Sequence, residues 1–361
     1  MLAMVAAATL GLAACTSDTS APGSGEPAEQ ESEAPVATDD IVLVESVRDL
    51  SNPYHVAMLE GAQMFADSVG LELTVLANDA DSQKQMSQIQ TLVASGKKIV
   101  LAVEPQTSSD ARAIVQAVVD AGGYVVTLMN KTDDLHPWDF GDNWVAHISY
   151  DNTESGYSIA KAMFEEMGGT GEIIVLRGVL DTPVDQQRYA GLERALEEFE
   201  GISVLDVQSA EFDRNKGFAL TQTLLNKYPG QIDGVWASND DMALGALQAL
   251  KAAGQEGDVF LVSIDGTPEA MDLIAEGTSG FLATVSPDAP WQGGAALALA
   301  YQAALGEYDV SSAPESDREF NGEQFLVTKD NVEDFLSAPK WSDYEADILD
   351  PLARKVGPIE Y

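Results

Sequence analysis

The chain has 361 residues, 45% of them hydrophobic, which is too much apolar material for one ordinary core and enough for two. Its 59 acidic side chains outnumber its 19 basic ones, and the formal net charge of −40 argues against nucleic acid and anionic lipid surfaces as partners. The single cysteine, Cys15, excludes a disulfide framework and any metal site built from several cysteines.

The N-terminal segment predicts export. Residues 2–14 are mostly apolar and end at Leu12-Ala13-Ala14-Cys15, which resembles the lipobox of bacterial lipoproteins; the run is too short to remain as a membrane-spanning helix. No Lys or Arg precedes it, so we expect the usual basic segment to lie upstream of the recorded start; a chance apolar terminus is the alternative. We therefore expect a lipoprotein signal over 1–15, with Cys15 lipidated, and a flexible acidic tether over 16–40.

From residue 41 the chain alternates short apolar runs with amphipathic stretches. The apolar runs predict strands over 41–44, 71–76, 99–103 and 124–129. The amphipathic stretches predict a helix opening at Asn52-Pro53 and further helices over 82–95 and 110–121. A looser segment, 130–144, interrupts the alternation.

The alternation restarts at Val145. Strands are predicted over 172–176, 203–207, 259–264 and 281–285, and helices over 152–167, 185–199, 214–228, 268–276 and 291–305. Strands and helices alternating over such lengths imply right-handed crossovers and a parallel sheet. Because the pattern occurs twice, the sequence predicts an α/β protein with two doubly wound parallel-sheet domains.

The stretch 233–254 shows how one loop of this pattern could bind a ligand. A buried-type strand, 234–237, is followed by Ser238-Asn239-Asp240-Asp241 and by a helix that ends at Gly254. Asp240 is predicted to cap the helix, which puts Asn239 just past the carboxyl end of the strand, where ligands bind in open parallel sheets. A capped loop with nothing bound is the alternative.

Four motifs in the body resemble those of the periplasmic ribose- and galactose-binding proteins, in register over about 41–330. They are Asn52-Pro53-Tyr54, Ala210-Glu211-Phe212-Asp213, the run 238–245, and Ile264-Asp265-Gly266-Thr267-Pro268. The resemblance implies a three-segment hinge with crossings near Asp151, 286–288 and residue 325, and a ligand in the cleft between the domains. It divides the body into 41–150 plus 288–325 and 151–287 plus 326–361.

The resemblance also implies a set of ligand contacts at strand ends facing the cleft: Asn52, Tyr54, His55, Asn130, Arg188, Phe212, Asn239 and Asp265. These residue types suit a sugar. Asn, Asp and Arg reach adjacent hydroxyl groups with two hydrogen bonds each, and Tyr54 and Phe212, one from each domain, can cover the apolar faces of a ring.

At three positions the chain departs from the family pattern. Asn130-Lys131 stands where some members have Asp-Arg, and a one-residue shift would place Met129 there instead. Pro287 replaces a usual amide, with Ser286 or Asp288 as substitutes. Val184 replaces a carboxylate that some members have, and Asp185 is adjacent. Asp185 and Asp288 are therefore secondary candidates.

Each candidate also has an ordinary structural alternative. Tyr54 and Phe212 could be packing aromatics, and His55 could lie at the surface or support a neighbour. Asp265 could cap the helix after Pro268, and Arg188 could pair with Asp185 on a helix surface.

The leading hypothesis is a solute-binding lipoprotein of an ABC importer, extracytoplasmic and lipid-anchored to the cell membrane, without enzymatic activity. We expect a neutral monosaccharide or polyol as ligand, a transporter permease as partner, a monomeric state, and no cofactor, metal or nucleic acid. A sugar sensor that presents its ligand to a membrane receptor shares this chemistry and stays open.

Two other classes fit less well. An α/β enzyme on this scaffold would need a catalytic motif, but G-x-S-x-G and phosphate-binding glycine loops are absent from the sequence, and His55, His136 and His147 have no metal spacing. A transcriptional regulator would need a basic helix-turn-helix ahead of Ile41, where the chain is apolar and then acidic.

Overall fold

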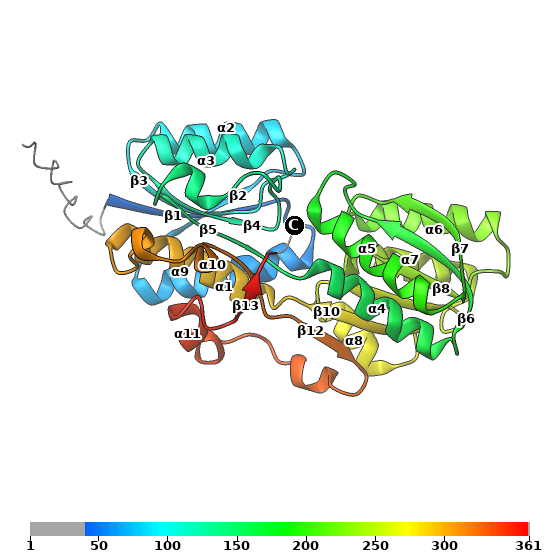
Figure 1. Cartoon of the computed structure of the whole chain (residues 1–361). Helices are drawn as coiled ribbons and strands as arrows, with labels where there is room; N and C mark the ends of the chain where they lie inside the picture. The colour runs from blue at the N-terminus through cyan, green and yellow to red at the C-terminus, as the bar shows by residue number, and fades with distance from the viewer. Residues whose placement is uncertain (1–39, 360–361) are drawn as a thin grey trace, which may run out of the picture. The chain divides into compact units, whose positions relative to one another are not determined.

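Residues 40–359 are described in this computed structural model, and they all belong to one compact unit. Cys15, the predicted signal and the tether up to residue 39 lie outside the described residues. The described part contains two sheets with helices on both faces of each (Figure 1). We call the part built around the seven-stranded sheet lobe 1 and the part built around the six-stranded sheet lobe 2.

The sheet of lobe 1 has the strand order β13-β11-β5-β4-β3-β1-β2, and all neighbours are parallel except β13 and β11. Its strands are β1 (Ile41–Val47), β2 (Leu73–Ala77), β3 (Lys98–Val103), β4 (Tyr124–Leu128), β5 (Trp144–Ser149), β11 (Glu319–Gly322) and β13 (Lys355–Pro358). Its longer helices are α1 (Pro53–Val69), α2 (Ser82–Val93), α3 (Asp110–Asp120), α9 (Ala289–Leu305) and α11 (Trp341–Leu349).

Alternate residues of these strands fill two cores, one on each face of the sheet. Val100 and Ala102 of β3 pack with α1 and α9, whereas Leu101 and Val103 pack with α2 and α3. Close contact between α1 and α9 depends on glycine, because a Cβ at Gly61 would lie 1.7 Å from the carbonyl oxygen of Pro290. The apolar run of β3 is therefore that of a strand buried on both faces.

Lobe 2 repeats this architecture with the strand order β12-β10-β9-β8-β6-β7, parallel except for β12 against β10. Its strands are β6 (Thr170–Arg177), β7 (Gly201–Ser209), β8 (Gly234–Ala237), β9 (Phe260–Ile264), β10 (Phe281–Ser286) and β12 (Phe325–Thr328). Its helices are α4 (Asn152–Glu166), α5 (Pro183–Glu198), α6 (Arg214–Lys227), α7 (Asp240–Ala253) and α8 (Pro268–Glu276). The prediction of two doubly wound α/β sheets is thus confirmed.

The chain passes between the lobes at residues 150–151, 287–288 and 323–324, and it passes a fourth time, over 336–340. After this last passage, α11 packs on α9 and β13 pairs with β11, so both belong to lobe 1. The expectation that all of 326–361 lies in the second domain is therefore wrong for 341–358. These residues supply the edge strand of the first sheet.

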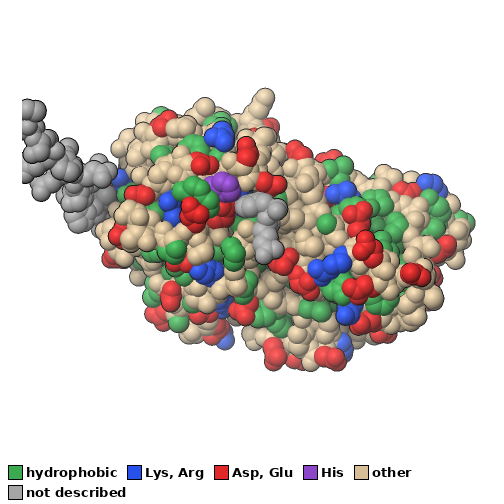
Figure 2. Space-filling view, in the orientation of Figure 1, with side chains coloured by type: hydrophobic (Ala, Val, Ile, Leu, Met, Phe, Trp, Pro, Cys, Tyr) green, Lys and Arg blue, Asp and Glu red, His purple; other side chains and the backbone are tan. Residues whose placement is uncertain are grey.

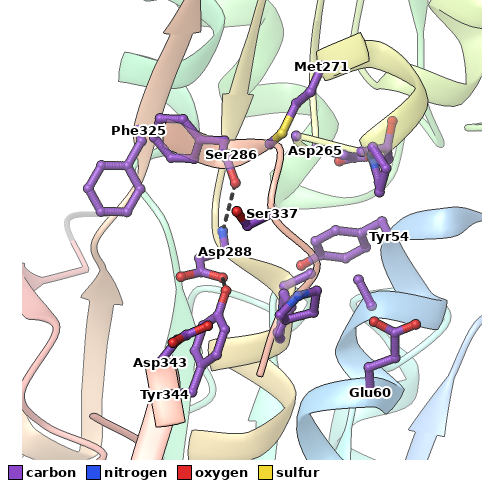
Figure 3. Close-up of a pocket in the computed structure, with 18 of the residues that line it drawn as sticks. Tyr54, Glu60, Asp265, Met271, Ser286, Asp288, Phe325, Ser337, Asp343 and Tyr344 are labelled. Atoms are coloured by element: carbon purple, nitrogen blue, oxygen red, sulfur yellow. Dashed lines mark hydrogen bonds between the residues drawn. The ribbon is translucent and has the colours of Figure 1, made fainter. Parts of the chain in front are cut away.

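The returning segment is fastened to two of the crossings. The carbonyl of Arg354 accepts a 2.8 Å hydrogen bond from the amide of Glu323, and its guanidinium binds the carboxylate of Asp288. The Tyr344 hydroxyl donates to Asp288 at 2.7 Å, and the Asp288 amide donates to Ser286 Oγ at 3.2 Å (Figure 3). Asp288 has a φ of 53°, in the left-handed region, so these contacts hold a hinge residue in a strained backbone conformation.

No helix among residues 40–359 is both long enough and apolar enough to cross a membrane. Carboxylates are spread over the face seen in Figure 2, with fewer Lys and Arg side chains among them. The acidic excess is thus a property of the folded surface as well as of the tether.

Candidate functional site

A pocket between the lobes collects all eight primary candidates. Lobe 1 contributes seven lining residues: Arg48, Asn52, Tyr54, His55, Glu104, Met129 and Asn130. Lobe 2 contributes five: Val184, Arg188, Phe212, Asn239 and Asp265. Eleven of these are only 2–9% exposed, and Phe212 is half-buried. The polar groups in the pocket are therefore largely withdrawn from water, where their hydrogen bonds and charges act most strongly.

The loop after β1 positions the first group of side chains. Asn52 caps α1, because its Oδ1 accepts a 2.9 Å hydrogen bond from the amide of Tyr54, and Pro53 occupies the first helical position. The Tyr54 hydroxyl donates to Gln292 of α9, which fixes the ring at the pocket wall. His55 follows and is 3% exposed, so the alternative of a surface histidine is wrong.

Glu104, directly after β3, is part of the lobe 1 wall. Its Oε2 lies 3.2 Å from His55 Nε2, and its Oε1 accepts from Asn130 Nδ2 at 3.4 Å. Burial alone raises the pKa of this carboxyl, but the bond with His55 and the positive charges of Arg48 and Arg188 outweigh burial and hold the pKa below its ordinary value. Glu104 is thus an anion inside the pocket.

Arg188 holds three parts of lobe 2 together from the first half of α5. Its Nε donates to Asn152 Oδ1 at 3.1 Å and its Nη1 to the carbonyl of Ser238 at 2.6 Å, while Nη1 lies 3.7 Å from Asp265 Oδ1. Arg188 therefore pairs with Asp265 on the lobe 2 wall of the pocket, and the alternative of a surface pair with Asp185 is wrong.

Asn239 and Asp265 follow neighbouring strands, β8 and β9, and meet at the carboxyl edge of the sheet. Asn239 Nδ2 donates to Asp265 Oδ2 at 3.3 Å. Burial raises the pKa of Asp265 well above its ordinary value, against the lowering effect of Arg188. Asp265 has a φ of 142°, a strained conformation of the kind that clusters at binding sites. It does not cap α8, whose N-cap residue is Thr267.

One detail of this loop differs from the prediction. Asn239, not Asp240, caps α7, since its Oδ1 accepts from the amide of Met242 at 3.0 Å. The carboxylate of Asp240 points into the lobe instead, where it accepts from the Thr267 amide at 2.7 Å and from Thr284 Oγ1 at 2.7 Å. Asp240 therefore joins the start of α7 to the loop after β9 and to strand β10.

Two aromatic rings approach the pocket from opposite lobes, Tyr54 from lobe 1 and Phe212 from lobe 2. Phe212 has a φ of 61°, and its ring occupies the space beside Gly178, where a Cβ would lie 2.0 Å from the ring. The guanidinium of Arg48 lies 5.5 Å from the centre of the Phe212 ring, so the two lobes touch there.

The secondary candidates lie elsewhere. Both oxygens of Asp185 are engaged outside the pocket, by Arg177 at 2.6 and 2.9 Å and by the amide of Gly178 at 2.6 Å. Asp288 lies at the hinge with Tyr344 and Arg354. The structure therefore brings neither Asp185 nor Asp288 to the pocket.

Beyond the predicted set, the pocket contains Arg48, Glu104, Met129 and Val184. Met129 and Val184 arose as departures from the family pattern, but Arg48 and Glu104 were missed. Both follow strands directly, Arg48 after β1 and Glu104 after β3, so the strand-end rule that selected Asn239 could have found them.

A second cavity, of about 650 Å³, lies beside the hinge and shares Tyr54 and Asp265 with the pocket (Figure 3). Its other walls include α11 and the 336–340 passage, and many of its lining side chains, such as Glu60, Asp334 and Asp343, are exposed. It lacks the converging buried polar groups of the first pocket, which we therefore take as the candidate site.

The charges and groups of the candidate site define its chemistry. Glu104 and Asp265 carry carboxyl groups and Arg48 and Arg188 carry guanidinium groups, so the formal charges balance. The twelve lining residues include no Ser, Thr, Cys or Lys, and residues 40–359 contain no group of three or more His, Cys, Asp or Glu that could hold a metal ion. The arrangement is suited to holding an uncharged molecule rich in hydroxyl groups.

Comparison with known proteins gives a consistent result. The family model of the periplasmic binding protein domain matches residues 44–308. The ribose import binding protein RbsB of Salmonella typhimurium is 35% identical over 253 residues, which cover 70% of this chain and 81% of that protein.

Two solved structures extend the comparison. A twin-arginine translocation pathway signal protein from Burkholderia phytofirmans is 40% identical with a TM-score of 0.85, over 89% of this chain and 98% of that one. An ABC transporter solute binding protein from Bacillus halodurans C-125, solved with bound myo-inositol, is 29% identical with a TM-score of 0.70, over 82% and 97% of the two chains.

The matched family is that of periplasmic binding proteins, and RbsB and the Bacillus halodurans protein are named as binding proteins, so this chain has a solute-binding role outside the cytoplasm and is not an enzyme. The extent of the family match, together with the identity to RbsB, is sufficient to assign the family. The chain belongs to the periplasmic binding protein family.

Proposed function

We propose that this protein is the solute-binding lipoprotein of an ABC importer and that it binds a neutral monosaccharide or polyol in the pocket between the lobes. The observation that carries the proposal is the balanced, buried set of planar polar groups around Arg188, Asp265, Asn239 and Glu104. A sugar acid or phosphate would call for a surplus of cationic groups, which these residues do not offer.

The side chains divide the work of recognition. Asn52, Asn239 and Arg188 donate to hydroxyl oxygens, whereas Asp265 accepts from hydroxyl protons, and bonds to charged groups are the stronger ones. Tyr54 and Phe212 cover the apolar C–H faces of the ligand from the two lobes. The names of two relatives, a ribose import binding protein and a protein solved with myo-inositol, support this ligand class.

Ligand binding favours closure of the lobes, because contacts from both sides form only in the closed arrangement. A ligand can shift this balance only by its difference in affinity for the open and closed forms. The closed, loaded form is the one that a permease must distinguish from the empty form. Lipid on Cys15, with two or three acyl chains, would hold the protein at the outer face of the cytoplasmic membrane near that permease.

A thermal-shift screen tests the ligand class. The chain from residue 36 is heated with D-ribose, D-allose, xylitol and myo-inositol, and with D-ribonate and ribose 5-phosphate as anionic counterparts. A neutral ligand at a hundred times its Kd should stabilise the protein by about 2.7 kcal/mol. Stabilisation by the anionic compounds alone would refute the proposal. Copurification with a permease, rather than with a receptor, separates import from the sensor alternative.

A further inference from the structure

The lobe 1 wall presents hydrogen-bond acceptors to the ligand. The amide of Asn130 is oriented by its surroundings, since Nδ2 donates to the carbonyl of Pro105 at 3.0 Å and to Glu104 at 3.4 Å. A flipped amide would set its oxygen against both of these acceptors. Asn130 Oδ1 is buried and has no hydrogen-bond partner among the described residues. Because buried polar atoms are normally hydrogen-bonded, we expect a donor group of the ligand to bind this acceptor.

Glu104 lies beside this open acceptor, and its backbone is fixed on both sides. The Glu104 amide donates to the carbonyl of Ser46 at 3.0 Å, and its carbonyl accepts from Gln85 Nε2 at 2.8 Å. Gln85 is fully buried and its Oε1 also accepts from the Gln106 amide at 2.9 Å. The carboxylate therefore cannot move away with its loop, and His55 holds it from the side.

We propose that Glu104 is a specificity-determining residue of this site, which with Asn130 Oδ1 makes the lobe 1 wall demand hydroxyl donors and reject ligand carboxylates and phosphates. This inference rests on the proposed function, and it identifies Glu104 as the group that selects neutral over anionic ligands. Lobe 2 supplies the complementary wall, where Arg188 and Asn239 present donors beside Asp265. A hydroxyl group satisfies both walls because it both donates and accepts, whereas an anionic oxygen only accepts.

The test replaces the charge of Glu104 and keeps its shape. In Glu104→Gln, the amide can still accept one hydrogen bond but no longer repels an anion. The bond from a ligand hydroxyl to a carboxylate is worth about tenfold to a hundredfold in affinity, and because Gln keeps one acceptor, the neutral ligand should bind more weakly by no more than that factor. The ratio of affinities for neutral and anionic ligands should fall at least about tenfold.

Glu45→Gln is the matched control. Glu45 lies on β1, one strand away from Glu104, where it pairs in register with Ala102; it is completely buried and does not line the pocket. Glu45→Gln makes the same substitution at a buried carboxyl of the same sheet, where burial raises the pKa and favours the neutral form, so it controls for the change of side chain and not for the loss of a charge. Its affinities and its neutral-to-anionic ratio should match those of the wild type within about twofold.

The measurements are calorimetric titrations of wild type and both variants with D-ribose, xylitol and myo-inositol, and with D-ribonate and D-xylonate as anions. A merely structural role for Glu104 would lower all affinities together and leave the ratio unchanged; that result overturns the inference, as does an equal effect of Glu45→Gln. Glu104→Asp, which retains the charge, should keep the preference for neutral ligands. Wild-type protein that binds none of the neutral compounds would instead refute the proposed function itself, and the inference with it.

Discussion

Replacing Arg188 by Met tests how far ligand binding and the integrity of lobe 2 depend on the same side chain. Arg188 is 4% exposed and joins the start of α4 through Asn152, the loop after β8 through Ser238, and the end of β9 through Asp265. Met has a similar apolar stem, so Arg188→Met removes the guanidinium and leaves little empty space.

The expected loss follows from these contacts. Two hydrogen bonds from a charged donor are removed, each worth about 1.5–3 kcal/mol, and Asp265 loses its counter-charge. Burial already raises the pKa of Asp265, and removing Arg188 takes away the charge that lowers it, so the neutral form of this carboxyl is favoured further and the penalty is limited. We therefore expect lobe 2 to lose about 3 kcal/mol of unfolding free energy, at the lower end of what breaking a buried pair costs.

The assay is denaturant unfolding, with Arg194→Met as control. Arg194 lies on the same helix and pairs with Glu154 at 2.6 Å, but both side chains are more than two-fifths exposed, so its loss should cost less than about 1 kcal/mol. Ligand affinity should fall at least about a hundredfold in Arg188→Met and stay unchanged in Arg194→Met. Equal stabilities of the two variants would refute the argument that Arg188 braces the lobe.

Four further outcomes are expected. Phe212→Ala should weaken ligand binding by only about 1–2 kcal/mol in a calorimetric titration, because it removes stacking area and no hydrogen bond; a larger loss would contradict the stacking role. Small-angle scattering should show a smaller radius of gyration with ligand, and an unchanged radius for a ligand that binds would count against hinge closure. Cys15→Ala, expressed with an upstream basic segment, should leave the membrane fraction; unchanged fractionation would rule out the lipid anchor. Burial, aided by the charge of Glu104, raises the pKa of Glu45, so the stability that Glu45 contributes is present below the ordinary Glu pKa and is lost as the pH rises toward the raised value. Unfolding of Glu45→Gln should therefore depend less on pH above the ordinary Glu pKa, and an identical pH profile would contradict the raised pKa.

Much of the architecture follows from sequence because the strands of both sheets are buried on both faces and appear as short apolar runs between amphipathic helices. Parallel strands of one sheet end at a common edge, so polar residues just after such runs, such as Asn239 and Asp265, converge there. That rule, sharpened by a family resemblance, was sufficient to collect the eight primary candidates in one pocket.

The errors have local causes. Asp240 has the side chain of a good cap, but a buried cluster with Thr267 and Thr284 uses its carboxylate, and the neighbouring Asn239 takes the cap. Asp185 is adjacent to a pocket residue but faces the other way, toward Arg177. Such choices depend on partners distant in sequence, which a local pattern does not contain.

The C-terminal error has a different origin. The strand β13 has four residues, and its pairing with β11 is antiparallel and joins segments more than thirty residues apart. Its residues are half-buried or exposed, so no apolar run marks it as a strand. The pairing of its backbone with β11 and the ion pair of Lys355 with Asp317 assign it to lobe 1.

Because lobe 1 is built from separate segments of the chain, the two lobes become complete at different times during synthesis. The helices and five of the six strands of lobe 2 lie between residues 152 and 286, so this lobe lacks only β12 once that stretch has been made. Lobe 1 begins first but is completed later than lobe 2, because β5 presents an open edge until β11 has been made, and β13 adds the edge strand only after that. Throughout this interval the nascent chain carries an unpaired, apolar strand edge, which is a template for pairing with other chains. We therefore expect the half of the protein that emerges first to be the half most prone to such pairing during synthesis.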